Sequence, residues 1–143
     1  MDDSGDCIFC KLTSHEVPAS VIYEDNHCMA LLDAFPLAEG HSLVLLKEHR
    51  INILDASPED LAAIMRVVKI IAPAVMKGTG AAGLNLFCNT ERCAGQAVPH
   101  IHFHLVPRHE NDGLKPDWKQ KQYEEGRAEI VCEKIRSFIP KAK

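Results

Sequence analysis

The sequence has no long apolar run and no excess of basic charge. No apolar stretch among its 143 residues reaches the roughly 18–20 residues that a membrane helix requires. Lys and Arg together number 16 and Asp and Glu number 20, which gives a formal charge of −4. No overall positive field therefore draws the chain to nucleic acid or to anionic lipid. We expect neither a nucleic acid nor a membrane as a partner, while a local anion site remains open.

The sequence also lacks the features of a secretory signal. Its first residues, Met1 to Asp6, are acidic and polar, whereas a signal peptide begins with basic residues and continues with an apolar run. We therefore expect a reducing compartment, the cytoplasm or also the nucleus. The six cysteines are then better explained as thiols or metal ligands than as disulfides.

The chain shows no internal repeat and no low-complexity segment. Its length is that of one domain, because typical domains have roughly 100–200 residues. Hydrophobic residues make up 46% and charged residues 25%, which are ordinary values for a globular protein with its own core. We therefore treat residues 1–143 as a single domain.

Strand-like segments alternate with turn signals and are interrupted by one long helical pattern. The predicted strands span residues 20–24, 27–32, 42–46, 84–88 and 100–106, the last closed by Pro107. The first two are separated by Asp25-Asn26, which is typical of a hairpin. About five mostly antiparallel strands with two helices indicate an α+β domain. The edges of such an open sheet favour dimerisation or cover by a helix.

The long helix begins near residue 57. Ser57 is a suitable N-cap, Pro58 suits the first helical position, and Asp60 completes an arrangement like a capping box. Apolar residues from 61 to 75 then recur at helical spacing, and Pro73 is predicted to kink or end the helix. A second, C-terminal helix is predicted from the apolar spacing of residues 131, 135 and 138, before Pro140.

Three histidines alternate with apolar residues in the last predicted strand. Successive side chains of a strand point to opposite faces, so His100, His102 and His104 share one face. Three imidazoles on one face allow two chemistries. They can bind a metal ion, or one neutral imidazole can attack phosphorus while its neighbours donate hydrogen bonds.

The segment from Gly95 to Val106 resembles the signature of the histidine-triad (HIT) family, in which alternating histidines follow a Gly-Gln pair. Further similar segments are Cys7–Cys10, Leu32–Pro36 and Gly40–Val44 with the following His49. The resemblance covers roughly residues 7–108, so residues 109–143 form a C-terminal extension outside the shared motif. It implies the HIT-like fold: a five-stranded antiparallel sheet with one long central helix, followed here by a C-terminal helix.

The resemblance implies a nucleotidyl hydrolase or transferase. His102 corresponds to the nucleophile that forms a nucleotidyl-histidine intermediate, and its other ring nitrogen is expected to donate to the backbone carbonyl of His100. His104 and His41 correspond to neighbours that bind phosphate and leaving group in one hydrogen-bond network. Gln96 corresponds to a residue near the leaving-group oxygen. A nitrogen nucleophile divides one difficult displacement into two easier ones.

Further residues correspond to nucleotide-binding positions of the family. Asp33 matches a carboxylate that binds the ribose hydroxyls, and Asn89 matches an amide beside the phosphate. Backbone N–H groups around Gly95, Ala97 and Val98 are expected to stabilise developing negative charge. Several family hydrolases have Ser where this chain has Ala97, so the side-chain hydroxyl contact is lost here.

The Cys7-x-x-Cys10 spacing is typical of metal ligands. By resemblance to relatives that have this pair, His49 and His100 complete the ligand set. Four protein ligands fill a tetrahedral site and leave no position for water, so the expected zinc ion is structural. It would join the N-terminal segment to the histidine strand.

The expected substrate is a purine nucleotide, an AMP conjugate of the adenosine 5′-phosphoramidate type, and the resemblance implies a homodimer. Three alternatives stay open: a dinucleoside polyphosphate hydrolase, a phosphoesterase with a catalytic metal on His102 and His104, and a nucleotide-binding protein without activity. Outside the motifs, Cys28, Cys88 and Cys132 are predicted to be core thiols. For Trp118 we weigh a contribution to the substrate pocket, as the C-terminal region makes in some relatives, against packing on the body, and we favour packing on the body.

Overall fold

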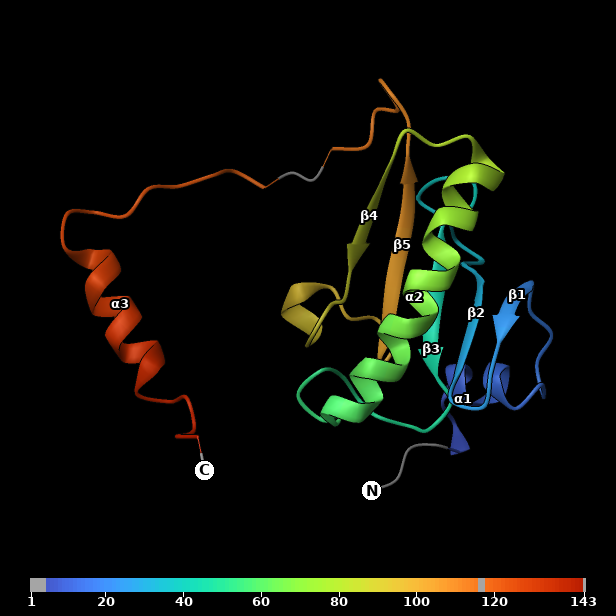
Figure 1. The fold of residues 1–143 in the computed structure, drawn as a ribbon, viewed down its shortest axis with the longest axis horizontal. Coiled ribbons are helices and arrows are strands. Elements are labelled where there is room, and N and C mark those ends of the chain that lie inside the picture. The colour runs from blue at the N-terminus through green and yellow to red at the C-terminus, as the bar shows by residue number, and fades with distance from the viewer. Residues whose placement is uncertain (1–4, 116–117, 143) are drawn as a thin grey trace.

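The computed structural model describes residues 5–115 and 118–142 (Figure 1). Five antiparallel strands form one sheet in the order β1-β2-β3-β5-β4. The strands are β1 (Val21–Glu24), β2 (Cys28–Leu32), β3 (Ser42–Leu46), β4 (Gly83–Phe87) and β5 (His102–Arg108). The helices are α1 (Ile8–Thr13), α2 (Pro58–Thr79) and α3 (Arg127–Arg136), with a 3-10 turn η2 (Arg92–Ala94). The predicted α+β domain, with a five-stranded antiparallel sheet, one long helix and a C-terminal helix, is confirmed.

Helix α2 covers one face of the sheet (Figure 1). Its inward residues, including Ile64, Val67 and Ile71, pack on Val44 and Leu105 in a buried cluster. The predicted capping box begins the helix: the Ser57 side chain accepts from the Asp60 N–H, and the Asp60 carboxylate accepts from the Ser57 N–H. The cap residues therefore identified the start of α2, and the apolar spacing identified most of its buried face.

Pro73 is predicted to kink or end α2, and the helix does not end there. The helix continues through Pro73 to Thr79, and Gly80 closes it at φ +69°, a conformation that glycine adopts without a Cβ clash. Packing of Ile71 and Val75 on either side of the proline outweighs the lost hydrogen bond.

Among the described residues, no helix has both the length and the apolar character needed to cross a membrane.

The opposite face of the sheet is partly covered by α1, which the sequence patterns did not reveal. Phe9 of this six-residue helix is buried and belongs to a second core cluster with Met29, Leu43 and Leu45. A helix this short has too few residues for a recognisable period, so packing alone defines it. Its importance is positional, because Cys7 and Cys10 lie at its start and within it.

The histidine strand is displaced by two residues from its predicted bounds. It begins at His102 and runs through Pro107 to Arg108, so His100 precedes it. Pro107 is tolerated because pairing with β3 ends at Leu105, and beyond that residue β5 pairs only with β4. Only His102 and His104 of the three therefore lie on the strand itself.

The C-terminal part differs from three expectations. Helix α3 ends at Arg136, before Phe138, and none of its side chains is buried. Cys132 is exposed on this helix and is therefore not a core thiol. Trp118 is 85% exposed and does not pack on the body as predicted. By contrast, Cys28 is fully buried as expected, and burial raises the pKa of its thiol to about 12, whereas Cys88 is half-buried.

Candidate active site and metal centre

The candidate active site lies where β3, β5 and β4 meet. In the paired strands, His102 is opposite Leu45 of β3, while His104 is opposite Leu43 of β3 and Phe87 of β4. The His102 and His104 rings are adjacent, with centroids 4.9 Å apart. Alternation along β5 therefore places two of the three predicted histidines side by side, and the strand register positions both rings.

One nitrogen of His102 is assigned by a backbone hydrogen bond. Its Nδ1 lies 2.7 Å from the carbonyl oxygen of His100, so Nδ1 carries the proton and donates it. The other nitrogen, Nε2, is therefore unprotonated and carries a free lone pair. The side chain is 7% exposed, and this burial lowers the pKa of His102 below its ordinary value, against the opposing effects of the His100 carbonyl and Asp33. His102 is consequently neutral at pH 7.

Two further histidines form a short hydrogen-bonded chain beside it. The Leu37 N–H donates to Nδ1 of His41 at 3.0 Å, so the proton of His41 lies on Nε2. That Nε2 is 2.9 Å from Nδ1 of His104 and donates to it. The proton of His104 therefore lies on its own Nε2. The Leu37 N–H thus determines which nitrogen is protonated in His41 and, through His41, which nitrogen is protonated in His104.

Burial keeps both of these rings neutral. It lowers the pKa of His104 to about 4, with the neighbouring His102 and His41 acting in the same direction. Burial likewise lowers the pKa of His41, although Asp33 opposes the shift. The Asp33 carboxylate is 3.6 Å from Nε2 of His41. Because His41 is neutral, this contact is not an ion pair.

Asp33 and His41 are placed by the connection between β2 and β3. Asp33 directly follows β2 and His41 directly precedes β3, and the Asp33 N–H donates to the His41 carbonyl. One carboxylate oxygen of Asp33 also accepts from the Phe35 N–H at 2.9 Å. The predicted pair is therefore brought to the histidine site by the closing of a single hairpin.

The loop before β5 contains the other predicted site residues. The Gly95 and Gln96 N–H groups donate to carbonyls of the η2 turn, at Arg92 and Glu91. Among the described residues, the N–H groups of Ala97 and Val98 have no hydrogen-bond acceptor, which leaves them available to a ligand. Gly95 adopts φ +96°, and a Cβ there would lie 3.3 Å from the amide nitrogen of Asn89.

Gln96 and Asn89 are held within this loop. The Gln96 amide donates to the carbonyls of Ile51 and Val98, and its oxygen accepts from the Glu91 N–H. The Asn89 amide donates to the Gly95 carbonyl at 3.4 Å. The structure thus brings both residues to the loop, where their present contacts maintain its shape.

Two phenylalanines in contact with the histidines were not predicted. The Phe87 ring stacks on His104 with centroids 4.6 Å apart, and Phe9 of α1 meets the edge of His102 at 4.8 Å. The alternation of β4 could have indicated Phe87, because it faces the same side as Asn85 and Asn89. Nothing in the sequence pattern pointed to Phe9.

A hollow of about 600 Å³ adjoins the histidines. It is lined by Leu37, Phe87 and Asn89, and on its outer side by Leu114, Lys115 and Trp118. None of the histidines lines the hollow itself, but the Leu37 N–H donates to His41 and the Phe87 ring stacks on His104. Its volume is within the usual range for small-molecule sites, about 300–1,000 Å³.

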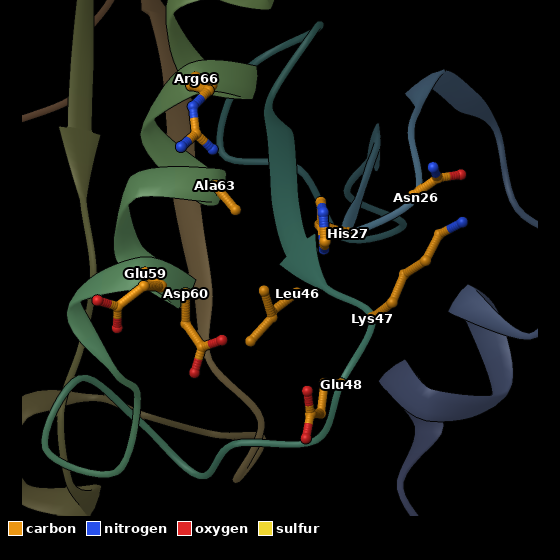
Figure 2. A pocket seen from close by; sticks show the side chains of 9 residues that line it. All are labelled: Asn26, His27, Leu46, Lys47, Glu48, Glu59, Asp60, Ala63 and Arg66. Atoms are coloured by element: carbon orange, nitrogen blue, oxygen red, sulfur yellow. The ribbon is translucent and has the colours of Figure 1, made fainter.

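A separate hollow of about 420 Å³ lies between the start of α2 and the β2–β3 side of the sheet (Figure 2). Figure 2 shows Glu59, Asp60 and Arg66 of α2 across from His27 and Lys47. None of the predicted catalytic or nucleotide-binding residues lines it. Its charges of both signs give no preference for an anionic ligand.

Four donors converge at the junction of α1 with the sheet: Cys7, Cys10, His49 and His100. The Sγ–Nδ1 distances are 3.3 Å from Cys7 to His100 and 3.3 Å from Cys10 to His49, and the two Nδ1 atoms are 3.2 Å apart. Ligands of one tetrahedral zinc ion are separated by about 3.3–3.8 Å, given the usual Zn–N and Zn–S lengths. The four predicted residues therefore fit a metal ion.

A backbone hydrogen bond also leaves the metal-facing nitrogen of His100 unprotonated. Its Nε2–H donates to the Leu46 carbonyl at 2.6 Å, so Nδ1 faces the cysteines as a lone pair. The residue is fully buried, and burial lowers its pKa to about 4. A neutral, oriented imidazole is the form that binds a metal.

The alternative of a catalytic metal on His102 and His104 finds no support in this geometry. Among the described residues, the second group of donors close enough for a metal consists of Asp33, His41 and His104, and it omits His102. Within that group, the 2.9 Å between His41 and His104 is the length of a hydrogen bond. Two imidazoles on one tetrahedral metal would be about 3.3 Å apart.

Comparison with known proteins agrees with these features. A family model of the HIT domain matches residues 14–111. The adenylylsulfatase HINT3 of Arabidopsis thaliana is 40% identical over 110 residues, which are 77% of this chain and 56% of that protein. The chain thus spans little more than half the length of this relative.

Solved structures show the same fold over nearly the whole chain. The crystal structure of a HIT family member from Bacillus subtilis is 31% identical, covers 96% of this chain and 99% of its own, and superposes with a TM-score of 0.89. A zinc-bound histidine triad family protein from Mycobacterium smegmatis is 36% identical, covers 94% of this chain and 98% of its own, and has a TM-score of 0.75.

Proposed function

Because the chain belongs to the HIT domain family, we propose that it is a nucleotidyl hydrolase that releases a nucleoside monophosphate through an intermediate on His102. The substrate class is an adenosine 5′-phosphoramidate or a related AMP conjugate. The adenylylsulfatase name of the Arabidopsis relative supports adenylyl chemistry and suggests sulfate as a further leaving group. A dinucleoside polyphosphate belongs to the same reaction type with a nucleotide as leaving group.

The observation that carries the proposal is the 2.7 Å contact between Nδ1 of His102 and the His100 carbonyl. This contact keeps the proton on Nδ1 and leaves the Nε2 lone pair free in a neutral ring. An imidazole that remains neutral at pH 7 is a competent nucleophile toward phosphorus. No other group is required to remove a proton from His102 before attack.

The reaction then proceeds in two displacements. Nε2 of His102 attacks the α-phosphorus, the bond to the leaving amine breaks, and the amine keeps the electron pair and takes up a proton from water. Water next attacks the same phosphorus, the P–Nε2 bond returns its pair to His102, and the surplus proton of the water is released. The same neutral imidazole thus serves first as the nucleophile and then as the leaving group.

The neighbouring groups bind and orient the phosphate. The Nε2–H of His104 donates to a phosphate oxygen or to the leaving group, because His41 holds the other nitrogen as an acceptor. The N–H groups of Ala97 and Val98 donate to the phosphate oxygens, on which negative charge develops, and Gly95 and Gln96 shape the loop that presents them. Asp33 binds the ribose hydroxyls, and Asn89 lies beside the phosphate.

The proposed zinc ion is structural. Cys7, Cys10, His49 and His100 would hold it, and the zinc-bound relative from M. smegmatis supports this metal. When bound, zinc supplies a rigid link between α1 and the residue that precedes β5. His100 then has two roles, since its side chain binds the metal while its carbonyl orients His102.

The proposal is tested by a single-turnover reaction with radiolabelled adenosine 5′-phosphoramidate, quenched in alkali. We expect a labelled protein adduct that is stable in alkali and released by acid. The His102→Asn variant should form no adduct and should lose about 10³-fold or more in turnover. The matched control is His109→Asn, because His109 is an exposed histidine after β5, and it should behave like the wild type.

Two results would contradict the proposed reaction. If AMP binds but no conjugate is turned over, the chain is a nucleotide-binding protein without this activity. If His102→Asn still forms the adduct, another residue is the nucleophile. Replacing the phosphoramidate with adenylyl sulfate or a dinucleoside polyphosphate in the same assay identifies the leaving group.

A further inference from the structure

Glu91 has a backbone conformation that is almost exclusive to glycine. The residue directly precedes the η2 turn, and its φ and ψ angles are +71° and 159°. A side chain with a Cβ is strained in this region, so a residue other than glycine stays there only where its surroundings hold it. Strain of this kind is concentrated at functional sites. Glu91 must therefore be held by contacts that offset the strain.

Four hydrogen bonds hold Glu91. Its N–H donates to Oε1 of Gln96 at 2.9 Å. Its carbonyl accepts from the N–H groups of Ala94 and Gln96 at 3.1 and 3.2 Å. Its carboxylate accepts from the side-chain amide of Asn52 at 3.1 Å. Because two of the four bonds involve Gln96, the strained conformation of Glu91 closes the loop before β5 onto that residue.

Asn52 joins Glu91 to a distant part of the chain. It lies in the connection between β3 and α2 and is only 3% exposed. Its amide oxygen accepts from the Leu54 N–H, so its NH₂ group faces the loop. This NH₂ group donates to Glu91 and lies 3.5 Å from Oε1 of Gln96. A buried amide without these acceptors would keep unpaired donors, which is costly.

The connection between β3 and α2 holds the same loop at two further points. The Ile51 carbonyl accepts from Nε2 of Gln96 at 2.6 Å, and the Arg50 carbonyl accepts from the Ile101 N–H at 2.7 Å. Residues 50–52 therefore hold the loop at its start, in its middle and at its end.

Ala97 and Val98 lie between these fixed points. Gln96 is held before them, and after them the Val98 carbonyl accepts from Nε2 of Gln96 at 3.0 Å and from the His100 N–H at 2.9 Å. The directions of the Ala97 and Val98 N–H groups are thus set by backbone that is held on both sides. Donors that stabilise a transition state act through such preorganisation, and a misplacement of about 1 Å can cost about 100-fold in rate.

We propose that Glu91 and Asn52 are positioning residues for the N–H groups that bind the phosphate. Their contact holds the loop in a strained conformation, in which Ala97 and Val98 present their N–H groups to the phosphate oxygens. Glu91 acts through Gln96 and the backbone of the loop. The kinetic consequence of this inference rests on the proposed function, whereas the conformation of the loop is measurable without turnover.

Paired substitutions at Glu91 test the strain. Glu91→Gly and Glu91→Ala both remove the carboxylate, but only glycine adopts these angles without strain. We expect Glu91→Gly to melt about 2 °C or more above Glu91→Ala in differential scanning calorimetry. The control pair is Lys69→Gly and Lys69→Ala at an exposed position within α2, where alanine should be the more stable. A melting temperature of Glu91→Gly equal to or below that of Glu91→Ala would overturn the strained conformation.

The contact with Asn52 is tested by kinetics with adenosine 5′-phosphoramidate. Glu91→Gln retains an oxygen that accepts from Asn52, whereas Glu91→Ala does not. We expect Glu91→Ala and Asn52→Leu to lower kcat about 10–100-fold with KM nearly unchanged, because the misplaced N–H groups act on charge that develops in the transition state. Glu91→Gln should recover most of this loss. Equal kcat in the wild type and Glu91→Ala would overturn the positioning role.

NMR relaxation of the backbone ¹⁵N nuclei tests the same role without turnover. In the full-length wild type, the Ala97 and Val98 amides should have order parameters of about 0.85, as in rigid backbone, and Glu91→Ala should lower them toward about 0.6. Glu91→Gln should restore them. Lower order in Glu91→Ala, in a protein that turns over no AMP conjugate, would refute the proposed function but support the role of Glu91 in holding the loop. Equal order parameters in all three proteins would overturn that role, whatever their activity.

Discussion

The four buried or half-buried histidines of the site each have one ring nitrogen committed to a specific partner. His100 and His102 donate to backbone carbonyls, while His41 accepts from a backbone N–H and then donates to His104. The backbone thus decides which nitrogen of each ring is free. This assignment was expected from the resemblance for His102 alone, because it depends on strand register and loop closure that no residue pattern encodes.

At the same scale, His41 acts as a positioning residue for His104. The variant His41→Leu removes the donor to Nδ1 of His104, so the His104 proton is no longer confined to Nε2. We expect kcat to fall about 10–100-fold with KM nearly unchanged, and His41→Gln, which retains an N–H donor, to recover part of the loss. Steady-state kinetics and ¹⁵N NMR of the His104 ring measure both effects.

Two results would contradict the positioning role of His41. If His41→Leu and the wild type show the same ¹⁵N shifts for His104, then His41 does not determine its tautomer. A fall in activity accompanied by a lower melting temperature for both variants would assign His41 a structural role only.

Among the elements, α1 depends most on contacts outside itself. It has six residues, and two of the four proposed metal ligands lie at its start and within it. The long α2 was recognisable from its apolar period and its Ser57–Asp60 cap, whereas α1 was visible only as a cysteine spacing. A helix of this length needs tertiary contacts, here the proposed metal and Phe9, to exist at all.

The metal centre leads to a prediction about this element. Cys10→Ser should abolish stoichiometric zinc binding and lower the free energy of unfolding by about 4 kcal/mol or more, because loss of a structural metal is among the largest single-residue effects. Elemental analysis and urea unfolding measure the two quantities. Cys93→Ser, which changes an exposed cysteine outside the centre, is the control and should retain both.

The metal prediction fails in a recognisable way. Equal zinc content in wild type and Cys10→Ser would exclude this ligand set. Loss of zinc without loss of stability would instead show that the ion does not join α1 to the sheet.

For the whole molecule, the buried histidines couple stability to pH. The pKa of His104 is about 4 in the folded protein and about 6.5 when exposed. Between these values the unfolded chain binds more protons, so stability rises with pH from about 4 and levels off above about 6.5. His41 contributes in the same direction because its pKa is also lowered by burial.

The pH dependence is tested by urea unfolding at pH 5 and pH 7.5. In the wild type we expect the free energy of unfolding to be lower at pH 5, and in His104→Gln we expect this difference to shrink by about 2 kcal/mol, the contribution of one histidine with these two pKa values. The exposed His109→Gln serves as control. An unchanged pH dependence in His104→Gln would show that His104 is not held neutral by burial.

The sequence by itself indicated the family, the class of the fold, the long helix and, through the resemblance, the residues proposed as the triad and as metal ligands. These features are encoded locally, in alternation along one strand, the capping of one helix and an ordered run from Gly95 to Val106. The confirmed five-stranded sheet follows from the same patterns. Local signals of this kind persist in any chain that folds to this architecture.

Only the tertiary structure decided how these parts act together. The order β1-β2-β3-β5-β4 brings His41 beside His104, and the exact start of β5 separates His100, whose ring faces the cysteines, from His102, whose ring faces the site. Packing of α2 on the sheet stabilises the helix beyond Pro73, whereas Cys132 and Trp118 have too few packing contacts to be buried. Contacts between residues distant in the chain decide these outcomes, and no local pattern contains them.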